Sequence, residues 1–279
     1  MPIHDQGYRP FQGTRLPRGR GWLVIARAGI RTVLARRAFL ALLLLAWLPF
    51  AVEAVKFYLT TTFGQVPMLA TTAQTFRAFL EHQEAFIFFI TIFVGAGLIA
   101  NDRRANALQI YLSKPLTRVE YVAGKAAILA VFLLGVTWVP GILLLALQAL
   151  FAGNFAFVRA NLFLLPAITV YALLQVSLAT FTMLALSSVS KSPRFVGIMY
   201  AGVIFFGDAI FGILKFVVNA SAASVVSPTQ SMAQIGDVIF RVPPRHDAPA
   251  SLSLLVVLVL IGLSIFVLER RIRGVEVVA

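Results

Sequence analysis

Long apolar stretches, separated by short polar segments, dominate the chain. Six of them are long enough to cross a bilayer as helices, which takes roughly 20 residues: about 38–59, 83–100, 126–150, 161–187, 195–218 and 250–268. Backbone groups in lipid must be hydrogen-bonded within the segment or to its neighbours, so helices are expected for these runs. The pattern predicts an all-α integral membrane protein, in which Pro49 and Pro140 kink two of the spans.

The stretch before the first span has a different pattern. In 22–37, "WLVIARAGIRTVLARR", apolar residues recur at helical spacing and arginines lie off that stripe. This predicts an amphipathic helix in the membrane interface; the alternative is a longer first helix that leaves the membrane. The expected organisation is a basic tail and interfacial helix over 1–37, a six-helix transmembrane domain over 38–268, and a C-terminal tail over 269–279.

Between the fifth and sixth spans lies the one sizeable connection on the side opposite the tails. Its first half, "NASAASVVSPTQSMAQIGDVIF", is apolar enough to form short helices that dip toward the membrane. Its second half, "RVPPRHDAPA", is rich in turn-forming residues.

Composition and charge support the membrane interpretation. The chain is 59% hydrophobic and 13% charged, whereas soluble domains have about a quarter charged residues. A net charge of +13 would suggest nucleic acid as the partner of a soluble protein. Here 18 of the 24 Lys and Arg residues lie in the two tails and in the segments 101–125 and 188–194. This bias places both tails and those segments in the cytoplasm, and nucleic-acid binding is not expected.

Sequence motifs for chemistry within the chain are missing. There is no cysteine, no G-x-x-x-x-G-K-[ST] phosphate loop and no H-E-x-x-H pattern. His4, His82 and His246 lie far apart on different segments. Ser187 and its neighbours precede Lys191, but "SSVSKSP" is better interpreted as a helix exit than as a hydrolase dyad. We therefore expect no enzyme activity, no metal and no cofactor in this chain.

Charged residues also fall within the apolar spans. A carboxylate such as Asp208 at the centre of a membrane helix costs roughly 2.5–3.5 kcal/mol. It is expected either to line a polar cavity or translocation path, or to anchor another helix, for example through Lys56 or a second copy of the chain. Lys215 follows on the same face, about 10 Å along the axis, too far for direct contact. Glu53 and Lys56 are spaced to pair with each other.

The segment 101–125, "NDRRANALQIYLSKPLTRVEYVAGK", is polar and helix-like between two apolar runs. Asn101 or Asp102 is expected to cap a short helix over 102–113, and Pro115 to end it. The apolar stripe of this helix needs a surface to cover: its own bundle, lipid headgroups, or a groove on another protein. The stripe is formed by Ala105, Leu108 and Leu112, and is extended by Tyr111.

This segment resembles the membrane subunits of type-2 ABC exporters. Many of these have, after the second span, an acidic residue, Gly-Thr, a run of leucines, Ser-x-Pro-Leu/Val-Ser/Thr-Arg, and Gly-Lys at the start of the third span. The match is "LQIYLSKPLTRVEYVAGK", in which Ser113, Pro115, Arg118, Gly124 and Lys125 agree, as do the six spans. Asn106-Ala107 stands in place of the usual Gly-Thr, and Arg104 in place of a usual glutamate.

The resemblance implies a function for the segment. The 102–113 helix would be the coupling helix that rests on a separate ABC ATP-binding subunit, which binds ATP and Mg. Two copies, or this chain with a second permease, would form the transport path of an exporter in the bacterial inner membrane. The alternative is a non-transporting scaffold or assembly factor, such as a maturation-type permease for a metalloenzyme. The residues expected to couple to the ATPase are Asp102, Arg104, Leu108, Tyr111, Leu112, Pro115 and Arg118.

Overall fold

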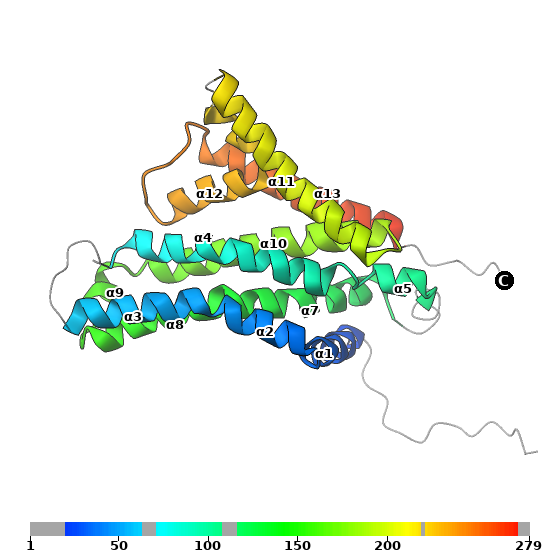
Figure 1. Ribbon diagram of the computed structural model, residues 1–279, viewed down its shortest axis with the longest axis horizontal. Coiled ribbons are helices and arrows are strands. Elements are labelled where there is room, and N and C mark those ends of the chain that lie inside the picture. Colours follow the sequence, from blue (N-terminus) through cyan, green and yellow to red (C-terminus); the bar gives the residue numbers. More distant parts are fainter. Residues whose placement is uncertain (1–19, 63–70, 108–115, 219–220, 273–279) are drawn as a thin grey trace, which may run out of the picture.

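The structure is a computed structural model that describes residues 20–62, 71–107, 116–218 and 221–272, and all regular elements among them are helical (Figure 1). In chain order the elements are α1 (Gly21–Leu34), α2 (Arg37–Ala46), α3 (Leu48–Thr62), α4 (Ala73–Ile90), the π-helical η2 (Thr91–Gly95), α5 (Ala100–Arg104), α7 (Arg118–Val136), α8 (Trp138–Phe151), α9 (Ala156–Ala160), α10 (Leu164–Val189), α11 (Pro193–Val218), the 3₁₀ helix η3 (Ser221–Val226), α12 (Pro228–Ile239) and α13 (Ala250–Arg271).

Six helical stretches among the described residues are long and apolar enough to cross a membrane, which confirms the all-α membrane fold. They run along the long axis in three tiers, with α2–α3 and α7–α8 on one side, α4 and α10 in the middle, and α11 and α13 on the other (Figure 1). α11 leans away from the middle tier toward its C-terminal end, where η3 and α12 fill the space beside it (Figure 1).

Two spans begin earlier than the sequence predicts. The second begins at Ala73 rather than near 83, and the third at Arg118 rather than 126. The extra turns of α4 contain Arg77 and Glu81, whose charges are paired with each other, so the apolar pattern alone missed them. The extra turns of α7 begin at the N-cap Thr117, whose hydroxyl accepts the Glu120 N–H in a capping box.

The kinks expected at the two prolines are present as helix breaks. α2 ends at Ala46 and α3 begins at Leu48, just before Pro49; α7 and α8 are separated at Thr137, three residues before Pro140. Proline in the first turn of a helix needs no N–H partner, which is why each new helix begins just before it.

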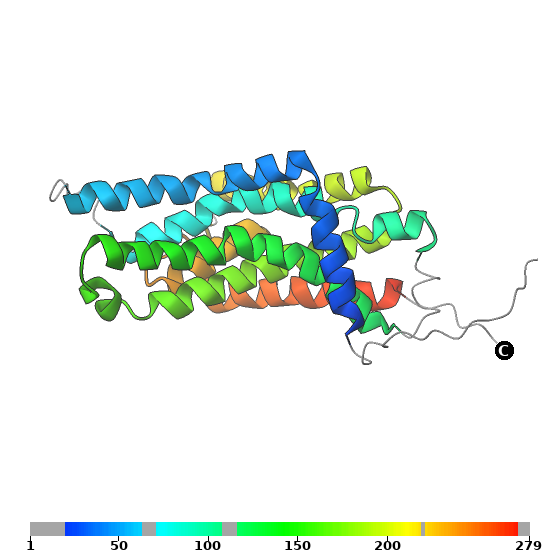
Figure 2. The same ribbon diagram turned by 90° about the horizontal axis from the view of Figure 1, so that it is seen from below.

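The basic N-terminal stretch forms a helix of its own, α1, which crosses the end of the bundle at a steep angle to α2 (Figure 2). It packs on α7, where Gly124 lets the two backbones approach: a Cβ there would lie 2.9 Å from the Trp22 carbonyl oxygen. Ala26 and Val33 are buried, whereas Leu23 is half exposed. The alternative of a single longer first helix is therefore wrong.

The segment between α11 and α13 also folds as predicted. Its apolar half forms η3 and α12, and α12 lies against α4, α10 and α13, while 241–249 is a turn-rich connection. Most of α12 is buried, including Met232, Ile235 and Asp237. This connection therefore forms part of the bundle core at the end where α4 begins.

Candidate functional site

Two helix ends flank the segment expected to couple to an ATPase, and they are bonded to each other. α5 ends at Arg104 and α7 begins at Arg118. Asp102 of α5 accepts a hydrogen bond from the Tyr121 hydroxyl at 2.7 Å and pairs with Lys125 Nζ at 2.6 Å, both on α7. The side chains of Asp102 and Lys125 are largely buried, so this α5–α7 contact is shielded from solvent.

The same helix end is bonded to the fourth span. After the π-helical turn η2, the second span makes irregular turns before α5 begins. Ser187 of α10 donates to the Ala96 carbonyl at 2.9 Å and accepts from the Ala100 N–H at 3.0 Å. In lipid each unsatisfied backbone group costs several kcal/mol, so Ser187 supplies bonds that the broken helix lacks. Arg103 adds a link by donating to the Ser188 carbonyl.

The predicted start of the coupling helix is wrong. α5 begins at Ala100, continues from the second span, and ends at Arg104, where Asn106 takes the left-handed conformation at φ 52°. Asp102 therefore does not cap a new helix but binds α7. Arg104 and Arg118 are exposed on either side of the connection. The other predicted coupling residues, Leu108, Tyr111, Leu112 and Pro115, lie outside the described residues.

The first span contains the ion pair that the sequence predicts. Lys56 Nζ donates to Glu53 Oε1 at 2.7 Å across one helical turn. Lys215, in the fifth span, lies with its Nζ 5.8 Å from the centre of the Phe211 ring. These charges are thus stabilised by neighbours on their own helices.

Asp208 has a partner that the sequence analysis did not name. It accepts a hydrogen bond from the Ser227 hydroxyl, whose oxygen in turn accepts the Gln230 N–H as the N-cap of α12. Its partner therefore comes from the connection between the fifth and sixth spans, not from Lys56. Asp208 also lines a cavity, but the walls of this cavity are mostly apolar, unlike the polar cavity that was expected.

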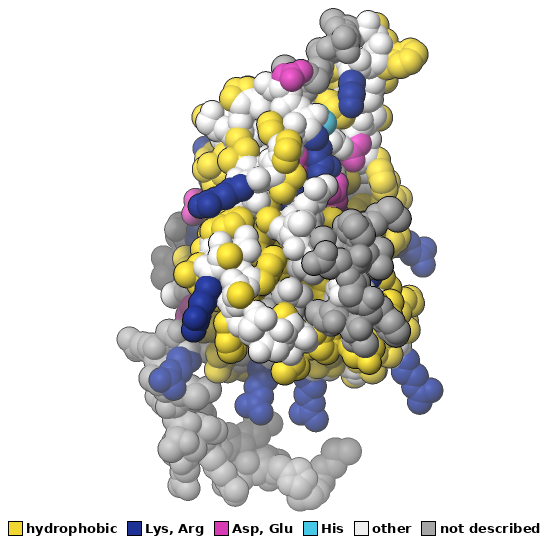
Figure 3. Space-filling view, turned by 90° about the vertical axis from the view of Figure 1, so that its left-hand side faces the viewer, with side chains coloured by type: hydrophobic (Ala, Val, Ile, Leu, Met, Phe, Trp, Pro, Cys, Tyr) yellow, Lys and Arg dark blue, Asp and Glu magenta, His cyan; other side chains and the backbone are white. Residues whose placement is uncertain are grey.

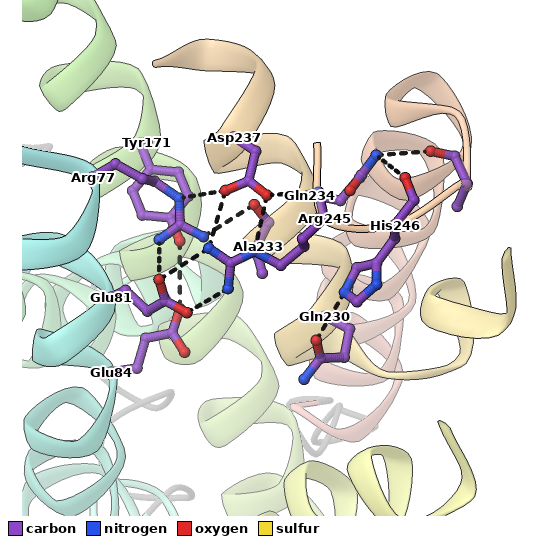
Figure 4. Close-up of polar contacts among 11 residues, drawn as sticks. Arg77, Glu81, Glu84, Tyr171, Gln230, Ala233, Gln234, Asp237, Arg245 and His246 are labelled. Carbon is purple, nitrogen blue, oxygen red and sulfur yellow. Dashed lines mark hydrogen bonds and ion pairs between the residues drawn. The ribbon is translucent and has the colours of Figure 1, made fainter. Parts of the chain in front are cut away.

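A cluster of four charged residues, Arg77, Glu81, Asp237 and Arg245, joins α4 to the connection between α11 and α13 (Figure 4). Arg77 donates from Nε to Asp237 and from Nη1 to Glu81, each at 3.1 Å, and from Nη2 to the Ala233 carbonyl. Arg245 bonds the same two carboxylates, at 2.9 Å to Asp237 and 2.6 Å to Glu81. The Arg77 and Asp237 side chains are 2% and 1% exposed.

Packing around this charge cluster is close. The Arg77 guanidinium lies 5.5 Å from the centre of the Tyr171 ring, and the Tyr171 hydroxyl donates to Glu84 at 3.4 Å. Gly236 on α12 leaves room for Arg77: a Cβ there would lie 2.6 Å from its Nε and 2.8 Å from the Tyr171 ring. Donation to Glu81 raises the pKa of Arg245 further above its ordinary value, so Arg245 keeps its positive charge.

His246 lies beside the cluster in the same connection (Figure 4). Its Nε2 is hydrogen-bonded to Gln230 at 3.0 Å, and its ring packs edge-on against Phe211. Burial, and next the positive charges of Lys215 and Arg245, lower the pKa of His246. The imidazole is therefore neutral at pH 7.

The charge cluster was not predicted from the sequence. Arg77, Glu81 and Glu84 are spaced at i, i+4 and i+7, which places them on one helical face, and this spacing was the available signal. The partners Asp237 and Arg245 are about 160 residues away, and no local pattern links them. Figure 3 looks at this end of the bundle, where acidic and basic side chains and a histidine interrupt a mostly uncharged surface.

A cavity of about 530 Å³ lies between the middle tier and the layer of α11, α12 and α13. Most of its walls are apolar, including Phe88, Leu178, Ile204, Leu260 and Val267. Two acidic side chains, Glu84 of α4 and Asp208 of α11, and the amide of Gln175 of α10 also line it. Hydroxyl groups are contributed by Thr182, Tyr200, Thr229 and Ser264. A concave, mostly apolar space with a few polar groups is the usual form of a small-molecule site.

The fold and these contacts define an all-α integral membrane protein with an apolar internal cavity and a buried charge cluster at one end. The chain matches no protein-family model and no curated protein sequence. Arguments about its function therefore rest on its own residues and their geometry.

Proposed function

We propose that the chain is the membrane-spanning subunit of an ABC transporter, an exporter, driven by a separate ATP-binding subunit. The α5–α7 contact of Asp102, Tyr121 and Lys125 carries the proposal. A segment that transmits force from an ATPase must be attached firmly at both of its ends. Here both ends of the 105–117 connection are bonded to each other, and the first is also bonded to α10 through Ser187.

Contacts with α1 add a second attachment. Gly21 at the start of α1 donates its N–H to Glu120 of α7 at 3.3 Å, and a Cβ on Gly21 would lie 2.4 Å from Leu116. A force on the connection would therefore reach the second, third and fourth spans and the interfacial helix together. Asn106 stands where the resembling exporters usually have glycine, and its left-handed backbone is one that glycine and asparagine both tolerate.

Orientation follows from the charge bias. The positive-inside rule places this end of the bundle in the cytoplasm, where an ATPase would be. ATP and Mg would be bound by that partner, and a second copy or a similar permease would complete the transport path in a bacterial inner membrane. A scaffold that binds an ATPase but moves no substrate is the alternative, and the same contacts would serve it.

The test uses the full chain co-expressed with the ATP-binding protein that copurifies with it, in proteoliposomes. Leu108→Asp with Leu112→Asp should release the ATPase, because two carboxylates would face its groove. Tyr121→Phe with Lys125→Met should keep the ATPase bound but lower ATP hydrolysis by the complex at least tenfold, because the ends of the connection could then move independently. Lys191→Met, an exposed basic residue on the same end, is the control.

An intact complex with an unchanged ATPase rate in Leu108→Asp/Leu112→Asp would show that the coupling assignment is wrong. Normal hydrolysis in Tyr121→Phe/Lys125→Met would exclude the α5–α7 contact from coupling. Coupled hydrolysis without movement of any substrate in a transport screen would favour the scaffold.

A further inference from the structure

The charged side chains that line the cavity between α4, α10, α11, α12 and α13 are both acidic, Glu84 and Asp208. Gln175 adds an amide oxygen that is buried and has no hydrogen-bond partner among the described residues. The other polar groups of the lining are hydroxyls. The described residues that line it include no Lys, Arg or His. In a low-dielectric surrounding, two carboxylates with no basic residue in the wall favour a positive charge.

The neighbouring arginines donate their hydrogen bonds to acids outside this wall. Arg77 and Arg245 donate to Glu81 and Asp237, while the hydrogen bond to Glu84 comes from the uncharged Tyr171 hydroxyl. Asp208 likewise accepts from a hydroxyl, that of Ser227. Both carboxylates therefore keep acceptor capacity toward the cavity.

The two acidic side chains and the amide lie toward one end of the space. Glu84 is bonded to Tyr171, one helical turn from Gln175 on α10, and Asp208 is bonded to the N-cap of α12. Toward the other end of α10 and α13 the lining is mostly apolar, with Leu186, Val189 and Val267, and its polar groups there are the hydroxyls of Thr182 and Ser264. The Ser264 hydroxyl donates to the Leu260 carbonyl of its own helix. The cavity thus has an acidic end and a mostly apolar end.

The rim shows how a ligand could enter. Phe89 of α4 and Phe205 of α11 both line the cavity and are 55% and 60% exposed. Leu263 of α13 lines it and is 57% exposed. Since these residues lie within the spans, the opening faces the hydrocarbon region, and entry is from the lipid rather than from water.

We infer that the cavity binds a hydrophobic cation: a small molecule with an apolar body and one positive charge, seated with the charge among Glu84, Gln175 and Asp208. A volume of about 530 Å³ lies within the range of about 300–1,000 Å³ found for small-molecule sites. This inference deepens the proposed function, because it names the class of substrate, and it rests on that proposal for its link to transport. Binding itself requires no ATPase.

The experiment compares two ions of the same shape and opposite charge, tetraphenylphosphonium and tetraphenylborate. Each is measured by equilibrium binding to the purified full chain in nanodiscs of uncharged phosphatidylcholine, with empty nanodiscs subtracted. We expect saturable binding of the cation at one site per chain and at least tenfold weaker binding of the anion. Ten-fold corresponds to about 1.4 kcal/mol.

Variants locate the site. Glu84→Gln with Asp208→Asn should weaken binding of the cation at least tenfold and remove the preference over the anion. Glu269→Gln is the matched control, because Glu269 is an exposed acid at the far end of α13. Ala85→Trp fills the cavity from an exposed position on α4 and keeps both carboxylates, so it should abolish binding even where the paired variant folds poorly.

Three results would overturn the inference: equal binding of the two ions, cation binding that survives Glu84→Gln/Asp208→Asn, or cation binding that survives Ala85→Trp. Loss of ATPase coupling with intact cation binding would contradict the proposed function and leave the site standing. Intact ATPase coupling without cation binding would contradict the inferred site and leave the proposed function standing.

Discussion

Replacing Arg77 with methionine removes the more buried of the two positive charges of the cluster and keeps an unbranched side chain over Tyr171. Asp237, only 1% exposed, would then lose one of its two arginine partners, and the Ala233 carbonyl would lose its donor. Removing one member of a buried ion pair costs about 3–5 kcal/mol. Arg245 still contacts both carboxylates. We therefore expect the lower end of this range, a decrease of about 3 kcal/mol in the free energy of unfolding.

The comparison with Glu81→Gln makes this a test of burial. The Glu81 side chain is 36% exposed, so solvent screens its pairs and the cost should be about 1 kcal/mol or less. Unfolding by sodium dodecyl sulfate in mixed micelles, followed by far-UV circular dichroism, measures the free energy of unfolding of both variants. The double variant Arg77→Met/Asp237→Leu should cost less than the sum of the single changes, because no charge of that pair remains buried.

Arg104→Met serves as the control for this series, since Arg104 is exposed at the other end of the bundle. We expect its effect to stay within about 0.5 kcal/mol. The reasoning is refuted if Arg77→Met costs no more than Glu81→Gln, or if the double variant is additive.

Two further predictions concern the same end of the molecule. Gly236→Ala should destabilise the protein by about 1–2 kcal/mol, because overpacking against Arg77 costs about 1–3 kcal/mol and exceeds the gain in helix propensity of up to about 1 kcal/mol. Gly262→Ala is the control, because the space around Gly262 is open. Equal Tm values for the two variants would contradict this prediction. Burial and then Lys215 lower the pKa of His246, so as pH falls through about 6.5 the unfolded chain takes up a proton before the folded one. Stability should therefore fall between pH 7 and pH 5 by more in the native protein than in His246→Gln, and identical pH profiles would exclude His246 as the cause.

Hydropathy was sufficient to predict the six spans, since roughly 20 consecutive apolar residues have few alternatives to a membrane helix. The pairing of Glu53 with Lys56 was equally local, because i, i+3 residues meet on a helix. The sequence did not locate the true start of the second span. Its first turns contain Arg77 and Glu81, and a hydropathy scan treats charges as polar whether or not they are neutralised by partners.

The candidate site was harder to predict because its parts come from distant segments. Asp102 was recognised as important, but the expected role as a helix cap was wrong, since the second span continues to Arg104. Its partners Tyr121 and Lys125 lie on α7, beyond the 105–117 connection, and only the return of the chain brings them near. Of the cavity, the sequence indicated Asp208 alone, because a single carboxylate in an apolar span stands out. Glu84 and Gln175 lie on two other helices, and no local pattern joins the three residues.

Basic residues at the two ends of the bundle have different surroundings. At the end of the bundle with few of them, Arg77 and Arg245 are held in the charge cluster, and the Arg241 guanidinium lies 4.3 Å from the centre of the Phe163 ring. At the other end, Arg104, Arg118 and Lys191 are exposed. If the orientation is the one proposed, a basic residue at the end with few of them opposes the positive-inside bias. Arg77, Arg241 and Arg245 each have a structural partner there, whereas Arg159 is exposed. By this argument the three partnered arginines are retained for the contacts that they make, and these contacts are the ones to test by mutation.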